Sequence, residues 1–416
     1  MSQFNSPDAT ASGFVALGVP PGLVAALAAR GITEPFAVQT LTIPDGLAGR
    51  DVCGKAQTGS GKTLAFGIPL IERTVHADQS EPHGLVLVPT RELCLQVAQA
   101  LLPLAEARGL TLAPIYGGAP MGAQIDRIQR GADLLIATPG RLIDLIDRKA
   151  VDVTHVASVV LDEADQMADM GFLPQVHQIM RRIGGSPQVM LFSATLDGQV
   201  QGLITRYLKD PIRHEVESDG DIADEQTHRF LAVHRLDKPK VGARIIRSVK
   251  RTLVFVSTRH GADRVAEDLR KEGIDAHAIH GDLKQSDRER RLADFTEGRL
   301  SALVATNLAS RGLDISDVDV VLHYEPPQDY KAFIHRSGRT ARAGESGLVV
   351  TLVEWDQVED VKRIQGASGL NYEIVKVFSN DDRLDDLVAH EPGTVELRRT
   401  SDVELSRRFR TGRRRR

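Results

Sequence analysis

The sequence has few cysteines, few aromatic residues and no long apolar run. Its two cysteines, Cys53 and Cys94, stand in no CxxC or metal-ligand spacing, so neither a disulfide framework nor a zinc site is expected. No run approaches the roughly 18 apolar residues of a membrane span, and residues 1–13 lack the apolar core of a signal peptide. These absences favour a cytoplasmic protein with no membrane part.

Aromatic residues make up only 4% of the chain, and no aromatic motif of the type found in RNA-recognition sheets is present. Proteins that read bases or hold single strands by stacking generally need such rings. If nucleic acid is a ligand, we therefore expect contacts to phosphate and 2′-OH groups. Such contacts would tolerate any sequence and favour RNA over DNA.

The net charge of −4 is unevenly distributed. Residues 407–416 carry seven arginines and no acid, which leaves 52 − 7 = 45 basic against 56 acidic residues, a charge of −11, on the rest of the chain. A basic end on an acidic body is typical of a tethered contact with a polyanion such as nucleic acid. It is equally typical of a solvated, disordered end, and the composition leaves both interpretations open.

Short apolar runs recur along the chain, and each ends in a cluster of small or polar residues. At 416 residues the chain is expected to form two or three domains. Runs rich in Val, Leu and Ile that alternate with helix-like segments predict a doubly wound parallel sheet, whose ligands bind at the carboxyl ends of the strands. The runs are residues 85–88, 134–137, 159–161 and 189–192, and then 253–256, 302–305 and 320–323.

The runs fall into two groups, which predicts two α/β lobes in tandem. The acidic residues 214–228 have no apolar period and are interpreted as a linker. Residues 1–30 are assigned to an N-terminal segment, 31–213 to the first lobe and 229–380 to the second. The polar residues 381–416 have no clear period and are expected to be disordered.

A phosphate loop is indicated at residues 56–63, AQTGSGKT, which departs from GxxxxGK[ST] only by its first residue. Glycines let backbone N–H groups approach phosphate oxygens, Lys62 supplies a charge near the β and γ phosphates, and the Thr63 hydroxyl can bind Mg²⁺. A Gly-rich turn with a chance GKT is the alternative. The loop residues predicted to bind the nucleotide are Thr58, Gly59, Ser60, Gly61, Lys62 and Thr63.

A second motif supports the phosphate loop. The apolar residues 159–161 lead into Asp162, the expected partner of a phosphate loop in holding Mg²⁺. Glu163, next to that ligand, is the candidate base that positions and deprotonates the attacking water. An acidic cluster alone is usually a solvated turn. After a buried strand and downstream of a phosphate loop, it indicates an NTPase with ATP and Mg²⁺ as cofactors.

Residues 162–165 spell Asp-Glu-Ala-Asp, and the chain resembles the DEAD-box RNA helicases over about residues 14–347. Singly the motifs are weak, but together they stand in the family's order. In the first lobe they are residues 31–39, with Phe14 seventeen residues ahead of Gly31, and residues 89–93, 117–118, 138–141 and 193–195. In the second lobe they are residues 280–288, 306–314 and 335–342.

The resemblance implies a role for each motif. Gln39 and Phe14 would recognise adenine, Asp314 would bind the ribose, and Arg339 and Arg342 would act as arginine fingers. Arg336, Arg339 and Arg342 recur at i+3, which predicts three cations on one helix face, although a solvated basic face is the usual fate of such a run. The predicted RNA contacts are Arg91, Gly118, Thr138, Pro139, Gly140, Arg141, Gly281, Arg288 and Thr306, and the predicted coupling residues are Asp165, Ser193, Thr195 and Arg336.

The chain departs from the family pattern at four positions. Asn307 stands where Asp is usual, Ser310 where Ala is usual, and Ser337 and Ala341 replace Ile and Gly. The first departure weakens any carboxylate role at position 307.

The resemblance implies two RecA-like lobes with a cleft between them. ATP and RNA would close the cleft and hydrolysis would release it. The expected activity is local RNA unwinding or remodelling of ribonucleoprotein or ribosomal particles by a monomer. An ATP-gated RNA clamp and a DNA-directed motor are the alternatives.

Overall fold

The computed structural model describes residues 13–56, 60–77, 80–196, 198–216, 226–307, 315, 318–340 and 347–389. The chain divides into two compact units, with the main boundary between residues 221 and 222, and each unit holds one seven-stranded sheet. Every strand pair in both sheets is parallel. The predicted pair of doubly wound lobes is therefore confirmed. None of the helices in the described ranges has the length and apolar character to span a membrane.

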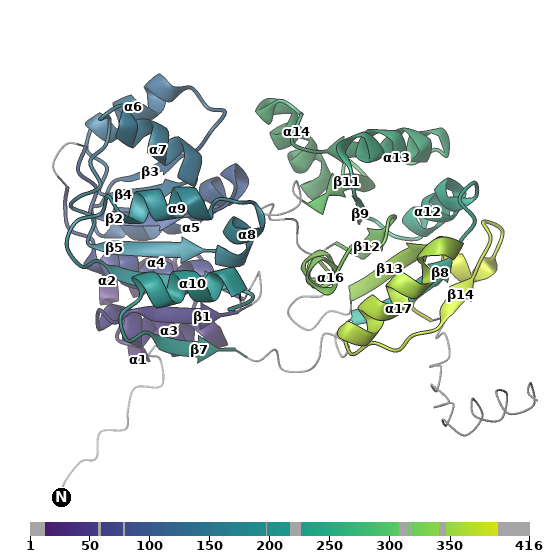
Figure 1. Ribbon diagram of the computed structural model, residues 1–416, viewed down its shortest axis with the longest axis horizontal. Coiled ribbons are helices and arrows are strands. Elements are labelled where there is room, and N and C mark those ends of the chain that lie inside the picture. Colours follow the sequence, from purple (N-terminus) through teal and green to yellow (C-terminus); the bar gives the residue numbers. More distant parts are fainter. Residues whose placement is uncertain are drawn as a thin grey trace, which may run out of the picture. The chain divides into compact units, whose positions relative to one another are not determined.

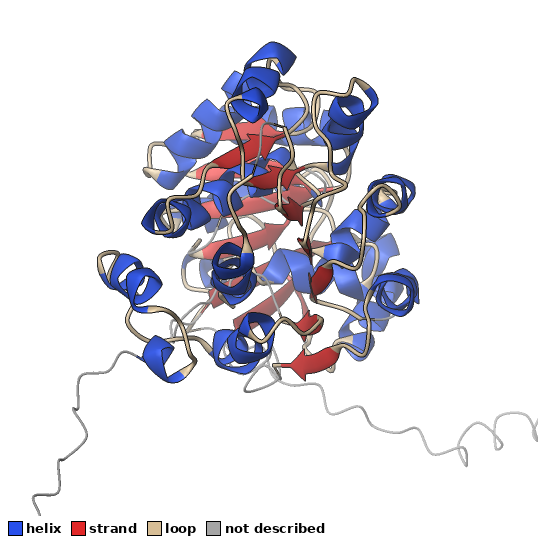
Figure 2. Cartoon of the chain, turned by 90° about the vertical axis from the view of Figure 1, so that its left-hand side faces the viewer, coloured by secondary structure: helices blue, strands red, loops and turns tan. Residues whose placement is uncertain are grey.

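The first lobe has the strand order β3-β4-β2-β5-β6-β1-β7, with helices on both faces of the sheet (Figures 1 and 2). Because successive side chains of a strand point to opposite faces of the sheet, Leu85 and Leu87 pack into one apolar core and Val86 and Val88 into the other. Its strands are β1 (Val52–Lys55), β2 (Gly84–Leu87), β3 (Leu112–Ile115), β4 (Leu134–Ala137), β5 (Ser158–Asp162), β6 (Gln188–Ser193) and β7 (Ile212–Glu215).

The helices of the first lobe include two in the predicted N-terminal segment. Phe14, Leu23 and Leu27 are fully buried and belong to the same core as α3, α4 and α5. The described part of residues 1–30 is therefore part of this lobe and not a separate segment. The helices are α1 (Gly13–Ala16), α2 (Pro21–Ala28), α3 (Ala37–Leu47), α4 (Lys62–Arg73), α5 (Arg91–Ala107), α6 (Met121–Gln129), α7 (Pro139–Asp147), α8 (Ala164–Asp169), α9 (Leu173–Met180) and α10 (Gly198–Tyr207).

The second lobe repeats this architecture with the order β10-β11-β9-β12-β13-β8-β14. Its strands are β8 (Gln226–Ala232), β9 (Thr252–Val256), β10 (Ala276–Ile279), β11 (Ala302–Thr306), β12 (Val320–His323), β13 (Gly347–Val353) and β14 (Ile374–Lys376). Its helices are α12 (Lys238–Arg247), α13 (Arg259–Lys271), α14 (Gln285–Thr296), α16 (Tyr330–Ser337) and α17 (Val358–Ala367), with 3-10 turns η1 (Trp355–Gln357) and η2 (Asp382–Asp385).

Both ends of the predicted linker are strand. β7 extends to Glu215 and pairs with β1, and β8 begins at Gln226 and pairs with β13. The linker of residues 214–228 is therefore too long in the prediction, and residues 217–225 lie outside the described residues. The acidic composition concealed the strand ends because β7 lies at a sheet edge, where only alternate residues are half-buried.

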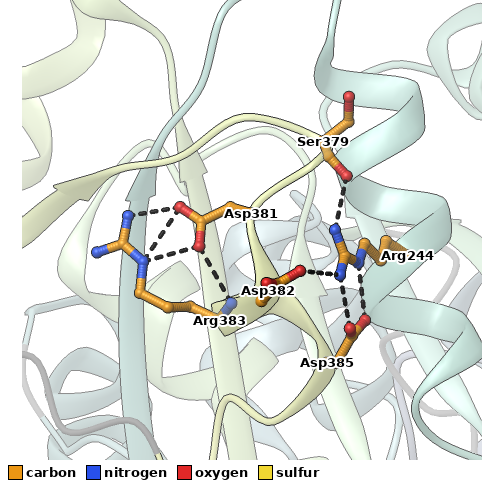
Figure 3. Close-up of polar contacts among 6 residues, drawn as sticks. All are labelled: Arg244, Ser379, Asp381, Asp382, Arg383 and Asp385. Carbon is orange, nitrogen blue, oxygen red and sulfur yellow. Dashed lines mark hydrogen bonds and ion pairs between the residues drawn. The ribbon is translucent and has the colours of Figure 1, made fainter.

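The prediction that the chain is disordered from residue 381 is wrong for residues 381–389. Arg244 on α12 pairs with Asp382 and Asp385 and donates to the carbonyl of Ser379 at 3.1 Å (Figure 3). Leu384 and Leu387 are buried in the lobe's core, and the buried Arg229 donates to the carbonyls of Leu387 and Val388. Residues 390–416, including the basic run, lie outside the described residues.

Candidate functional site

The phosphate loop follows β1 and ends at the first turn of α4. Gly61 adopts a φ of +89°, and a Cβ atom there would collide with the Gln39 amide and the Phe36 ring. Glycine is thus required on two counts. Lys62 and Thr63 begin α4, the lysine buried and the threonine half-buried. Ser60 precedes them, while Thr58 and Gly59 lie outside the described residues.

An acidic cluster at the carboxyl end of β5 meets this loop. Asp162 is the last residue of β5, and Glu163 follows in a left-handed conformation with a φ of +51°. Lys62 Nζ donates to Glu163 Oε1 at 2.7 Å, and Gln166 Nε2 donates to Glu163 Oε2 at 3.0 Å. All four side chains are buried. The two predicted motifs therefore form one site, and Gln166 is a member that the sequence did not indicate.

The charges of this cluster do not balance. Burial raises the pKa of Asp162 to about 7; Lys62 opposes that shift, and Glu163 adds to it. Burial disfavours the charged form of Lys62, but Glu163, Asp162 and Asp165 together raise its pKa. One ammonium group thus faces three carboxyl groups, an excess of negative charge that a divalent cation would neutralise.

The oxygens available here fit Mg²⁺. The Thr63 hydroxyl and the Asp162 carboxylate are the hard oxygen donors that Mg²⁺ takes beside phosphate oxygens. One Asp162 oxygen already accepts from the Glu163 N–H at 3.0 Å, which fixes the orientation of the carboxyl group. These two residues would hold the metal.

The predicted coupling residues of this lobe lie beside the acidic cluster. Ser193 ends β6 and is fully buried, and its hydroxyl accepts from the Asp165 N–H at 3.2 Å. The Ser193 carbonyl accepts from the Ala56 N–H at 3.0 Å, where the phosphate loop starts. Ser193 thus contacts both motifs, while Thr195 lies half-buried two residues further on.

Gln39 lies between the adenine motif and the phosphate loop. It is buried on α3, its amide oxygen accepts from the Phe36 N–H at 2.9 Å, and its amide nitrogen donates to the Gly61 carbonyl at 3.0 Å. An amide group keeps one further donor and one further acceptor for a base. Phe14 is fully buried in the core, so stacking on adenine would require the ring to be uncovered. Both adenine roles stay predictions.

We expect Gln39→Ala to weaken ATP binding roughly tenfold and to narrow the preference for ATP over GTP. The variant would remove the hydrogen bond to the Gly61 carbonyl and the predicted one to the base, together worth about 1–2 kcal/mol. The measurement is the Kd of both nucleotides by competition with a fluorescent analogue. An equal loss for ATP and GTP would contradict the adenine role and leave Gln39 as a support of the phosphate loop.

A second polar cluster in the first lobe joins three motifs predicted to contact RNA. Gly118 has a φ of +87°, and a Cβ atom there would collide with the guanidinium group of Arg91, the first residue of α5. Arg141 donates to the carbonyl of Ala119 at 3.1 Å. The 117–119 turn therefore lies against both arginines.

Thr138, Pro139 and Gly140 start helix α7 beside these arginines. Thr138 is the N-cap, and Gly140 is exposed in the first turn. Pro139 is buried and starts the helix, so a direct contact with RNA would require it to be uncovered, and its role stays a prediction.

The predicted helix face of three arginines is interrupted after Arg336. Helix α16 ends at Ser337, so Arg339 lies in the following turn, and Arg342 lies outside the described residues. Arg336 is buried; its Nε donates to Asn307 Oδ1 at 2.5 Å, its Nη1 donates to the Glu325 carbonyl at 2.9 Å, and its guanidinium group lies over Phe255. The usual residue at position 307 is Asp, and its replacement had put the role of a carboxylate acceptor there in doubt. The neutral amide oxygen of Asn307 accepts a hydrogen bond from Arg336 instead.

The turn that carries Arg339 is held in place by residues that the sequence did not indicate. Gln226 Nε2 donates to the carbonyls of Ser337 and Thr340 at 3.0 and 3.1 Å, and the Thr340 hydroxyl donates to the Val318 carbonyl at 2.6 Å. Arg339 is buried in this braced turn. The predicted linker included Gln226, because a single polar residue gives no sign that it bonds to residues 337 and 340.

The remaining second-lobe predictions fall at the carboxyl ends of β10 and β11. Gly281 is exposed after β10 and Arg288 is half-buried on α14. Thr306 is buried as the last residue of β11, so a contact with RNA phosphate would require it to be uncovered. Asp314 and Ser310 lie outside the described residues.

Comparisons with known proteins match both lobes. A family model described as DEAD/DEAH box helicase matches residues 36–203, and one described as Helicase conserved C-terminal domain matches residues 237–344. DEAD-box ATP-dependent RNA helicase CshA of Bacillus subtilis is 35% identical over 389 residues, which cover 93% of this chain and 78% of that protein.

Further similarities include a plant protein and a solved structure. The mitochondrial DEAD-box ATP-dependent RNA helicase 9 of Arabidopsis thaliana is 39% identical over 86% of this chain and 60% of its own length. The chain spans 58 to 62% of the plant relatives that it matches. The structure of S. cerevisiae Dbp5 bound to RNA and ADP BeF3 has a TM-score of 0.79 and 28% identity, and covers 91% of this chain and 98% of that chain.

Proposed function

This chain belongs to the DEAD-box family of ATP-dependent RNA helicases, and we propose that it hydrolyses ATP in a reaction stimulated by RNA. Each ATP cycle would separate a short RNA duplex or remodel a ribonucleoprotein particle. The observation that carries this proposal is the buried cluster of Lys62, Asp162 and Glu163, in which the Lys62–Glu163 distance is 2.7 Å.

Each member of that cluster has a chemical task. Lys62 would stabilise the charge on the β and γ phosphates, and Thr63 with Asp162 would hold Mg²⁺, which neutralises those oxygens. Glu163 would orient the attacking water and take its proton. Gln166, which donates to the second Glu163 oxygen, would keep the carboxylate in the orientation that the water needs.

The second lobe would supply the remaining charge. We propose that Arg339, and Arg342 with it, reaches the γ-phosphoryl group when ATP and RNA bind. An arginine that arrives only in the reactive state can make hydrolysis depend on RNA. Arg336, which connects α16 to Asn307 at the end of β11, would couple that movement to the strand that ends in Thr306.

RNA is the proposed polyanion. Arg91 and Arg141 both contact the 117–119 turn, and the free N–H groups of a helix N-terminus, as at α7, suit phosphate oxygens. The Dbp5 structure was solved with RNA, which supports the same ligand here. We further propose that the protein acts as a monomer in the cytoplasm, with ribonucleoprotein particles as partners.

The test is the ATPase rate of the full chain with RNA and with DNA of one sequence. We expect single-stranded RNA to raise kcat at least tenfold over the basal rate and DNA to raise it far less, since 2′-OH contacts distinguish the two. Unwinding of a short RNA duplex should require ATP. Equal stimulation by DNA would contradict the RNA assignment, and RNA binding without any unwinding would make the protein an ATP-gated clamp.

A further inference from the structure

Three large apolar side chains are exposed at one edge of the second lobe. Leu236 is 83% exposed, Trp355 55% and Phe378 51%. They follow the carboxyl ends of β8, β13 and β14, which are neighbours in the sheet in the order β13-β8-β14. We call these three side chains the aromatic edge. Large exposed apolar groups gathered in this way mark a binding surface more often than scattered ones do.

Polar and cation–π contacts fix the three loops to one another. Lys376 Nζ lies 5.1 Å from the centre of the Trp355 ring and 5.2 Å from that of Phe378. Asp237 accepts from the N–H and the hydroxyl of Ser379, both at 2.7 Å. The aromatic edge is therefore prebuilt, and a ligand would not have to order it.

The loop after β8 is also fixed to the loop after β13. The buried Lys238 pairs with Glu354 at 2.8 Å, next to Trp355. Every pair of the three loops thus has at least one ionic, hydrogen-bonded or cation–π contact.

A groove opens beside the aromatic edge. It has a volume of about 740 Å³, within the range of about 300–1,000 Å³ typical of sites for small ligands. Helix α17 lines one side, and residues 370–374 and β14 line the other. Trp355 belongs to both the groove and the aromatic edge, and Lys376, which lies by the Trp355 ring, also lines the groove. A flat ring stacked on Trp355 would therefore have an apolar hollow next to it.

The aromatic edge lies at the same end of the sheet as the predicted RNA contacts of this lobe. All strands are parallel, so β11, which ends in Thr306, and β13, which ends shortly before Trp355, present their carboxyl ends along one edge. The two strands are three positions apart, or ~14 Å at about 4.8 Å per strand. A nucleic-acid strand that runs along this edge past Thr306 comes next to Trp355.

We propose that the aromatic edge binds unpaired bases of RNA that extends beyond the duplex on which the protein acts. This inference rests on the proposed function. Single-strand sites combine stacking rings with a cation for the phosphates, and the Lys376 ammonium group lies near both the Trp355 and the Phe378 rings. The exposed charges here are mixed, since Arg235 and Lys376 are accompanied by Asp356, Glu359 and Glu373. The proposal therefore depends on the exposed rings and the Lys376 ammonium group beside them, and not on a net positive charge. Stacking tolerates any base, which agrees with a sequence-tolerant enzyme.

Trp355 makes the proposal directly measurable because it is the chain's only tryptophan. The emission of the full chain is recorded while it is titrated with RNA that carries a single-stranded extension at either end, and with the blunt duplex. We expect a saturable quench with one or both extended RNAs and none with the blunt duplex. Phe378→Ala or Lys376→Ala should weaken binding of the extended RNA by roughly 5- to 150-fold, the range for loss of one stacked base.

Tyr330→Ala is the matched control, since Tyr330 is a partly exposed ring of the same lobe outside the aromatic edge. It should leave the quench and the affinity unchanged. Trp355→Ala should lower affinity for extended RNA while kcat at saturating RNA stays at the wild-type value, because Trp355 lies outside the ATP site.

Two results would overturn the inference while the proposed function stands. Extended RNA that stimulates hydrolysis without changing Trp355 emission, at either end of the duplex, would show that the aromatic edge does not bind RNA. An emission change that follows protein concentration in the absence of RNA would assign the surface to contact between copies of the chain. A quench by RNA with no stimulated hydrolysis would support the inference and count against the proposed function.

Discussion

Glu163→Gln is expected to lower RNA-stimulated turnover by about 10²- to 10⁴-fold, the range for loss of a general base. The amide is nearly the same size and can still accept from Gln166, but it cannot take a proton from water. Binding should persist, because Lys62, Thr63 and Asp162 remain. Since we expect hydrolysis to release RNA, the variant should stay bound to RNA in the presence of ATP. The measurements are single-turnover hydrolysis and the RNA dissociation rate in ATP.

The matched control is Asp169→Asn, the same chemical change at an exposed residue of helix α8. It should keep wild-type turnover and RNA release. Rapid release of RNA by Glu163→Gln in ATP would sink the assignment of Glu163 as the base. A variant that no longer binds ATP would instead make Glu163 a structural partner of Lys62.

Arg339→Ala is expected to slow RNA-stimulated hydrolysis by about 10³-fold or more, the low end for an arginine finger. Affinity for ATP without RNA should change little, because we propose that Arg339 meets the phosphate only in the reactive state. Arg339→Lys should recover little of the rate, since lysine lacks the planar pair of donors. The measurement is kcat at saturating RNA for both variants.

Burial of Arg339 calls for two controls. Thermal unfolding separates lost chemistry from a damaged turn, and Arg363→Ala, an exposed arginine on α17, should change neither rate nor stability. Gln226→Leu removes the donor to the carbonyls on either side of Arg339 and should slow hydrolysis while ATP affinity is kept. Normal turnover in Arg339→Ala would remove the arginine-finger role.

Seven strands inside the two sheets were predictable because they are short apolar runs buried on two faces. The runs at residues 134–137 and 320–323 coincide with β4 and β12, and the other five differ by one residue at one or both ends. Edge strands were not predictable. β7 and β14 are only half-buried, and β14 has three residues, so neither makes an apolar run.

The parts of the site that are local motifs could be predicted from the sequence. Contacts between residues far apart in the chain could not. Residues 60–63 and 162–163 are neighbours in the sequence, so their phosphate-binding and acidic motifs can be recognised from the sequence alone. The contact of Gln226 with Ser337 joins residues 111 apart, and that of Arg244 with Asp385 joins residues 141 apart. The sequence around Asp385 is polar and resembles a solvated tail, because nothing in it shows that Asp382 and Asp385 pair with the distant Arg244. Likewise, the i+3 spacing of the arginines predicts one helix face, but Gly338 is the C-cap that ends α16 before Arg339.

The 2.7 Å pair between Lys62 and Glu163 has a consequence for the order of events. Two anionic groups would compete for the Lys62 ammonium group: the Glu163 carboxylate and the phosphates of the nucleotide. While Glu163 holds it, that carboxylate oxygen is occupied and is a poor proton acceptor for water. A triphosphate that drew Lys62 away would free the proposed base at the moment the substrate is in place. Release of phosphate would return the ammonium group to Glu163, so the base would be blocked again after each turnover and whenever no nucleotide is bound.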